Sequence, residues 1–117
     1  MARKAMVAAD LEVDDSTGAV LVQTGPPAAA AVSSAVNVTA AGVVALAANA
    51  DRRGALLVND SDTVMYLKLG AGPAVNAGIR LNANGGSYEI NGANLYQGII
   101  TAIHGGAGNK VLLITEL

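Results

Sequence analysis

The chain has 117 residues, a formal net charge of -2 and no cysteine. This length suits one domain with an appended segment, and the lack of cysteine excludes disulfides and thiolate metal sites. Basic residues are few and scattered, so the chain cannot neutralise a run of phosphates and nucleic acid is not an expected partner. Residues 16–50 carry no charge at all. Alanine dominates that stretch, and a membrane span needs about 20 strongly apolar residues, so no membrane contact is expected either.

Alanine and valine supply most of the apolar residues, while phenylalanine and tryptophan are absent. An alanine side chain buries little area, so the core of such a chain is thin for its length. Association with further copies adds stability by mass action. These considerations favour a homo-oligomer.

Residues 1–33 are predicted to form an N-terminal arm. Leu11 and Val13 alternate with acidic residues, and a short apolar strand over 19–22 follows a polar turn, so a small hairpin is expected. The Gly-Pro-Pro sequence at 25–27 ends it, because proline lacks the N–H group that a strand ladder needs. For residues 28–36 both helix and strand remain open.

Residues 34–117 are predicted to form an all-β domain. Alternating or continuous apolar residues indicate strands over 36–40, 43–47, 55–58, 64–69, 79–83, 88–90, 95–103 and 110–117. For residues 40–50 an alanine-rich helix competes with the strand. Short strands about ten residues apart, separated by Gly/Asn turns, are typical of antiparallel sandwiches and barrels. The prediction is an antiparallel β-sandwich, jelly-roll-like, with about eight short strands.

The segment 52–70 is the clearest local pattern, and it is predicted to be a hairpin. Its two strands flank the turn sequence Asn-Asp-Ser-Asp at 59–62, whose side chains bond to their own backbone. Arg52 and Arg53 precede the first strand. They could pair with Asp60 or Asp62 across the hairpin, or with an acidic surface of a partner.

No pattern indicates catalysis, so the chain is not expected to be an enzyme or to hold a cofactor or a metal. The acidic residues 10–15 begin like a calcium loop but lack its glycine and its final glutamate. His104 stands among glycines with no nucleophile or carboxylate beside it, and a loop residue without a special role is the favoured interpretation. The glycine-rich stretches 70–72 and 105–110 lack the ending of a phosphate-binding loop.

Residues 53–70, which read Arg-Gly-Ala-Leu-Leu-Val-Asn-Asp-Ser-Asp-Thr-Val-Met-Tyr-Leu-Lys-Leu-Gly, resemble a segment common in small virion proteins of tailed bacteriophages. The similarity extends through residues 72–76, 79–81, 85–89 and 96–100, so it covers roughly residues 50 to 117. It implies a non-enzymatic structural protein, most similar to head decoration (cement) proteins. These sit as homotrimers on the capsid exterior and bind the major capsid protein. The chain would then be assembled in the host cytoplasm and reside in the virion.

The alternative is a tail, baseplate or head-fibre component that takes part in attachment to the host surface. A small enzyme or a ligand-binding barrel is a further rival, for which the sequence offers no site. Tyrosines number only three, too few for a carbohydrate platform, and packing in the core or an interface is their expected role. The residues expected to contact a partner, in the arm and around the 52–70 segment, are Leu11, Val13, Val20, Val22, Arg52, Arg53 and Tyr66.

Overall fold

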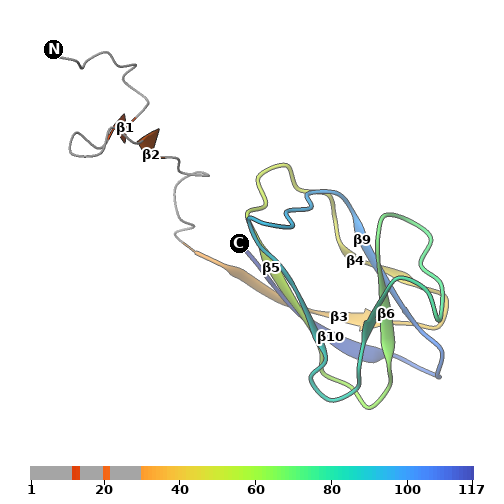
Figure 1. Cartoon of the computed structure of the whole chain (residues 1–117). Coiled ribbons are helices and arrows are strands. Elements are labelled where there is room, and N and C mark those ends of the chain that lie inside the picture. Colours follow the sequence, from red (N-terminus) through yellow and green to blue (C-terminus); the bar gives the residue numbers. More distant parts are fainter. Residues whose placement is uncertain (1–11, 14–19, 22–29) are drawn as a thin grey trace, which may run out of the picture.

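The computed structural model describes residues 12–13, 20–21 and 30–117, and these contain strands and no helix (Figure 1). Residues 30–117 form two four-stranded antiparallel sheets that enclose a common core. In spatial order, the first sheet contains β3 (Val32–Val38), β10 (Lys110–Glu116), β5 (Ala55–Asn59) and β8 (Ser87–Ile90). The second contains β4 (Val43–Leu46), β9 (Ile100–His104), β6 (Met65–Leu69) and β7 (Ile79–Leu81). The prediction of an all-β domain with about eight short strands is confirmed.

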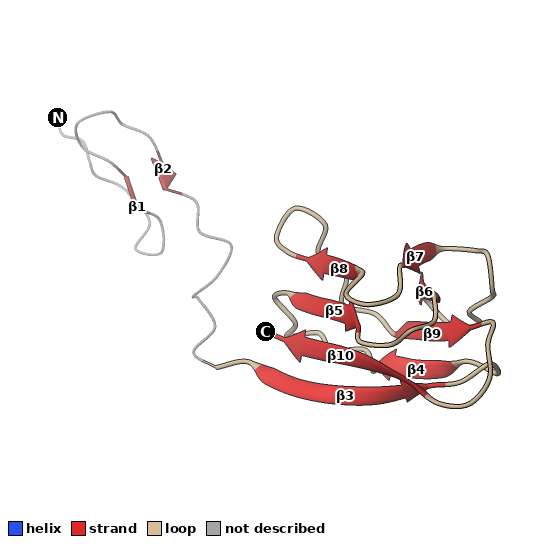
Figure 2. Ribbon diagram, turned by 90° about the horizontal axis from the view of Figure 1, so that it is seen from below, coloured by secondary structure: helices blue, strands red, loops and turns tan. Residues whose placement is uncertain are grey.

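The strands of the domain pair in a nested pattern. β3 pairs with β10, β4 with β9, β5 with β8, and β6 with β7, so the first strand meets the last and the middle two meet each other. Two further pairings, of β5 with β10 and of β6 with β9, complete the sheets. Figure 2 shows the result, in which β3 and β10 run side by side although they lie at opposite ends of the domain sequence. Apart from the β6–β7 connection, every connection from β3 to β10 crosses between the sheets.

This pairing corrects the prediction of a 52–70 hairpin. β5 and β6 are strands, as expected, but they belong to different sheets and are not hydrogen-bonded neighbours. The turn between them is built on Asn59, which is fully buried. Its Nδ2 donates to the carbonyls of Thr63 (2.8 Å) and Leu81 (3.1 Å), and its Oδ1 accepts from the N–H (3.1 Å) and hydroxyl (2.6 Å) of Ser61. A polar turn signal marks a chain reversal but does not determine which strands pair afterwards.

The core between the sheets comes from alternate residues of each strand. Leu57, Leu112 and Ile114 face inward from the first sheet, and Met65 and Leu67 face them from the second; all are almost fully buried. Alternation therefore places one face of each strand in the core, as the period of two requires. Leucine, isoleucine and methionine supply most of its volume, and three buried alanines (Ala45, Ala55 and Ala102) fill the remaining gaps.

The two segments left open between helix and strand are settled wherever the structure describes them. Residues 43–46 form β4, so the alanine-rich helix over 40–50 is excluded. β3 begins at Val32, and the boundary expected between 33 and 34 therefore falls inside a strand. The strand expected over 95–103 begins only at Ile100, and residues 95–99 are loop.

In the N-terminal segment, β1 (Glu12–Val13) pairs antiparallel with β2 (Val20–Leu21), which agrees with the small hairpin expected there. Val13 lies opposite Val20. The remaining residues of interest in this segment lie outside the described residues: Leu11, Val22 and the acidic residues Asp10, Asp14 and Asp15. The helix-or-strand alternative for 28–29 lies outside them too.

Candidate functional site

The outer faces of the two sheets differ in their covering. Over the β4-β9-β6-β7 sheet, the loop 70–78 lies against the outward-facing side chains. Thr101 Oγ1 donates to the carbonyl of Gly70 (2.6 Å), and the Tyr66 hydroxyl donates to Asn76 Oδ1 (2.9 Å). Thr101 is consequently only 4% exposed although it points away from the core. The chain's own loop therefore covers part of this face, whereas Val44 on β4, opposite Thr101, stays 51% exposed.

The outer face of the β3-β10-β5-β8 sheet carries apolar side chains on its two central strands, β10 and β5. Leu56 on β5 and Leu113 on β10 point outward and are 42% and 40% exposed. Val58 pairs with Leu113 on the same face, and Val111 lies further along β10; both are half-buried. We call Leu56, Val58, Val111 and Leu113 the outer apolar patch. Contiguous apolar surface of this kind marks interaction sites more often than isolated exposed side chains do.

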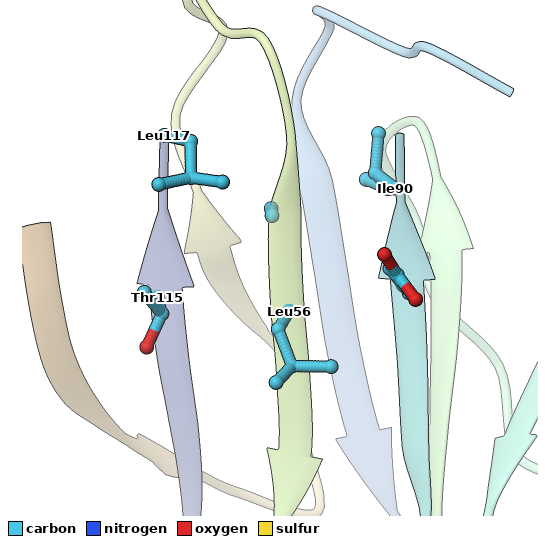
Figure 3. Close-up of a pocket in the computed structure, with 6 residues that line it drawn as sticks. Leu56, Ile90, Thr115 and Leu117 are labelled. Atoms are coloured by element: carbon cyan, nitrogen blue, oxygen red, sulfur yellow. The ribbon is translucent and has the colours of Figure 1, made fainter. Parts of the chain in front are cut away.

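A shallow groove of about 350 Å³ opens at one end of this patch (Figure 3). Its walls are Ala55, Leu56, Glu89, Ile90, Thr115 and Leu117. Leu56 on β5 and Leu117, which follows the end of β10, border it, and Glu89 is the one charged side chain among its lining residues. Thr115 and Glu89 are the two lining residues with polar side chains, and the other four are apolar. A groove with this lining can accept an apolar side chain, with a hydrogen-bond donor near Glu89.

Arg52, expected at a surface, is fully buried inside the domain. Its Nε donates to Glu116 Oε2 (2.8 Å). Its Nη1 donates to the carbonyls of Tyr96 (2.9 Å) and Gly98 (3.0 Å), and its Nη2 donates to the carbonyl of Ala47 (2.6 Å). The guanidinium therefore joins the end of β10 to two loops. Its role here is structural, since a buried charge is tolerated only when it is paired and hydrogen-bonded.

Neither arginine forms an ion pair with Asp60 or Asp62, which is one of the two alternatives that the sequence leaves open for them. Asp62 accepts instead from Lys110 Nζ (3.0 Å) and from Thr63 Oγ1 (2.9 Å). Both hydrogen bonds lower the pKa of the Asp62 carboxyl, and the one from Lys110 has the larger effect. Arg53 is half-buried, and its backbone N–H donates to the carbonyl of Leu117 (2.7 Å) beside the groove.

The other residues expected to bind a partner do not converge on one place. Tyr66 lies on the covered face, with its hydroxyl held by Asn76. Val13 and Val20 are register partners in the β1–β2 pair, and Leu11 and Val22 are not among the described residues. Only Arg53 adjoins the groove. Sequence reasoning missed the outer apolar patch, because an alternating strand does not reveal which of its apolar residues faces outward until both sheets are known.

His104 is the last residue of β9, not a loop residue, and it is fully buried. Its Nδ1 accepts from the N–H of Gly106 (3.0 Å), which leaves Nε2 to carry the proton and donate to the carbonyl of Gly108 (2.7 Å). Both ring nitrogens are therefore used in holding the β9–β10 loop. The ring has no nitrogen free for a metal or a substrate.

Within the described ranges, no group of three or more His, Cys, Asp or Glu side chains is placed to hold a metal ion. The same part of the chain contains no helix of the length and apolarity needed to cross a membrane. Comparison of the chain with protein-family models, with curated proteins and with solved structures finds no match.

Proposed function

We propose that the chain is a non-enzymatic structural protein of a tailed-phage particle, which binds capsid subunits and stabilises the exterior of the head. The observation that carries the proposal is the outer apolar patch, continuous with the groove, on a sheet face that no described segment covers. A patch of leucine and valine next to an apolar groove fits a protein partner, because interface cores are apolar and poor in charge. The resemblance of residues 53–70 to phage virion proteins supplies the identity of that partner, the major capsid protein.

We further propose that the domain is a jelly roll. The strand orders β3-β10-β5-β8 and β4-β9-β6-β7 support this. In a jelly roll, one long antiparallel ribbon is folded into two sheets. The first strand then pairs with the last, and the two middle strands pair with each other. Jelly rolls of eight strands occur in viral capsid and lectin domains. The topology is thus compatible with a virion role, although a fold alone does not determine function.

Mass spectrometry of purified particles, separated into heads and tails, tests the proposed role. The expected result is a copy number close to that of the major capsid protein in the head fraction. A few copies in the tail fraction would contradict decoration and favour the alternative of a tail or baseplate component. Absence from both fractions would contradict a virion role altogether.

The outer apolar patch gives a mutational prediction. Leu113→Asp places a charge in the middle of the patch, and we expect capsid binding to weaken by about thirtyfold or more, as for loss of an interface hot spot. Because Leu113 points outward, its substitution leaves the core intact and the variant is expected to fold. Binding is measured by cosedimentation with undecorated capsids.

The matched control is Val75→Asp. Val75 is 39% exposed, close to the 40% of Leu113, but lies in the loop over the other sheet. It is expected to bind capsids like the unchanged protein. Equal binding by both variants would show that the patch is not the capsid contact.

The arm proposed over residues 1–33 gives a second prediction. We expect deletion of residues 1–25 to leave the domain folded, because its core residues all lie between 38 and 114, and to abolish stable capsid decoration. An extended segment can add a strand to an exposed sheet edge of a capsid subunit, and this contact would be lost. Cosedimentation and circular dichroism of the truncated protein measure the two effects. Full decoration by the truncated protein would refute the arm's role.

A further inference from the structure

The four edge strands of the domain are unequally protected against pairing with another chain. β7 has three residues and carries Arg80, and β8 has four and carries Glu89. β4 has a register shift between Val44 and Leu46, which interrupts its edge. Short length, charge and bulges are the ways in which natural proteins block unwanted pairing at sheet edges.

β3 has none of these protections. It is seven residues long, reads Val-Ser-Ser-Ala-Val-Asn-Val, and contains no charge and no proline. Its pairing with β10 is regular over all seven residues, so its other edge presents a regular row of backbone groups. No other described segment pairs with that edge. In Figure 2, β3 borders its sheet along its whole length. Such an edge is a template for a further strand.

The inner face of β3 is also incompletely covered. Val32 lies opposite Glu116 and therefore points to the core side of the sheet, yet it is 67% exposed. At the other end of the strand, Val38 is fully buried. β3 therefore has an exposed, inward-facing valine at one end and a buried valine, at the edge of the core, at the other end.

We propose that β3 is an interface between two copies of this chain, which pair antiparallel through their β3 edges about a two-fold axis at Ala35. In this register Val32 lies opposite the partner copy's Val38, Ser33 opposite Asn37, and Ser34 opposite Val36. Residues of the same face then meet, because a shift of one residue would reverse the faces. The exposed Val32 of each copy then lies beside Val38, at the edge of the other copy's core, and becomes covered.

A second copy fits this edge for a reason that does not apply to an arbitrary partner. A two-fold interface brings each surface patch against itself, so a charge near the axis would face a like charge. Residues 30–50, which include both β3 and the adjacent edge strand β4, carry no charge, whereas the opposite edges carry Arg80 and Glu89. The uncharged stretch of the sequence therefore forms the side of the domain on which two copies would meet, where like charges would repel each other.

The test is the oligomeric state of the full chain in solution, measured by analytical ultracentrifugation across a series of concentrations. We expect a monomer–dimer equilibrium, with a dimer of twice the 11.6 kDa chain mass. Ala35→Lys, at the proposed axis on the exposed outer face, brings two ammonium groups together and is expected to weaken the dimer by about tenfold or more. Ser87→Lys, on the outer face of the opposite edge strand, is the matched control and is expected to leave dimerisation unchanged.

Hydrogen exchange gives a second readout, independent of mass. Alternate backbone N–H groups of β3 point away from β10, and these are expected to gain protection as the protein concentration rises. A monomer at every concentration, a closed trimer, or a dimer that Ala35→Lys does not weaken would overturn the proposal. The result is separable from the proposed capsid role, since decoration is measured on particles and self-pairing on the free protein.

Discussion

Replacement of Arg52 by alanine is expected to lower the free energy of unfolding by about 3–5 kcal/mol, the cost of breaking a buried ion pair by removing one partner. The side chain is fully buried and makes one bond to Glu116 and three to backbone carbonyls. Without it, the carbonyls of Ala47, Tyr96 and Gly98 lose their donor, and Glu116 loses its counter-charge. Since small domains have a total stability of about 5–15 kcal/mol, the variant is close to unfolding. Equilibrium denaturation in urea measures the change.

Two variants separate the geometry of the guanidinium from its charge. Arg52→Lys keeps the charge but cannot reach acceptors on three sides at once, because an ammonium on a flexible stem lacks the planar fork. We therefore expect it to be destabilised by more than half as much as the alanine variant. Arg53→Ala is the neighbouring control, since the Arg53 side chain makes no hydrogen bond to the described residues. A loss of stability no larger in Arg52→Ala than in Arg53→Ala would refute the structural role assigned to Arg52.

Strand positions in this chain could be predicted from local pattern, whereas strand partners could not. In β5 and β6, runs of apolar residues mark the strands, and the polar turn between them ends one strand and starts the next. The partner of β5 is decided by contacts far along the chain, with β8 on one side and β10 on the other. Such pairings depend on the burial of both faces of the whole domain, which a local pattern does not contain.

The buried polar groups were equally hidden from sequence reasoning. Arg52 and Arg53 are consecutive arginines, yet Arg52 is fully buried and Arg53 is half-buried. The distinction comes from Glu116 and from two loops that meet only in the folded chain. The lack of charge over residues 16–50 is visible in the sequence, where it raises only the question of a membrane span. Its coincidence with two edge strands on one side of the domain becomes evident only from the sheet order.

A second large effect is expected for Asn59→Asp, which changes a single atom of a buried side chain. Nδ2 of Asn59 donates to the carbonyls of Thr63 and Leu81, so an ionised carboxylate would direct negative charge at two carbonyl oxygens. We expect the free energy of unfolding to fall by about 3–5 kcal/mol at neutral pH, as for other uncompensated buried charges. The turn that links the two sheets would be weakened first, because Asn59 and Ser61 hold it together.

The pH dependence distinguishes this charge effect from a simple loss of packing. Burial and the facing carbonyls raise the pKa of the new carboxyl in the folded state, so folding favours its protonated form. The unfolded chain binds fewer protons in the interval between the two pKa values, and the stability of the variant relative to the unchanged protein therefore increases as the pH falls through that interval. Asn109→Asp, at an exposed loop position, is the matched control and is expected to show no such trend. A deficit for Asn59→Asp that stays constant from neutral to acidic pH would show that the loss comes from altered packing, and the role assigned to the two carbonyl acceptors would be wrong.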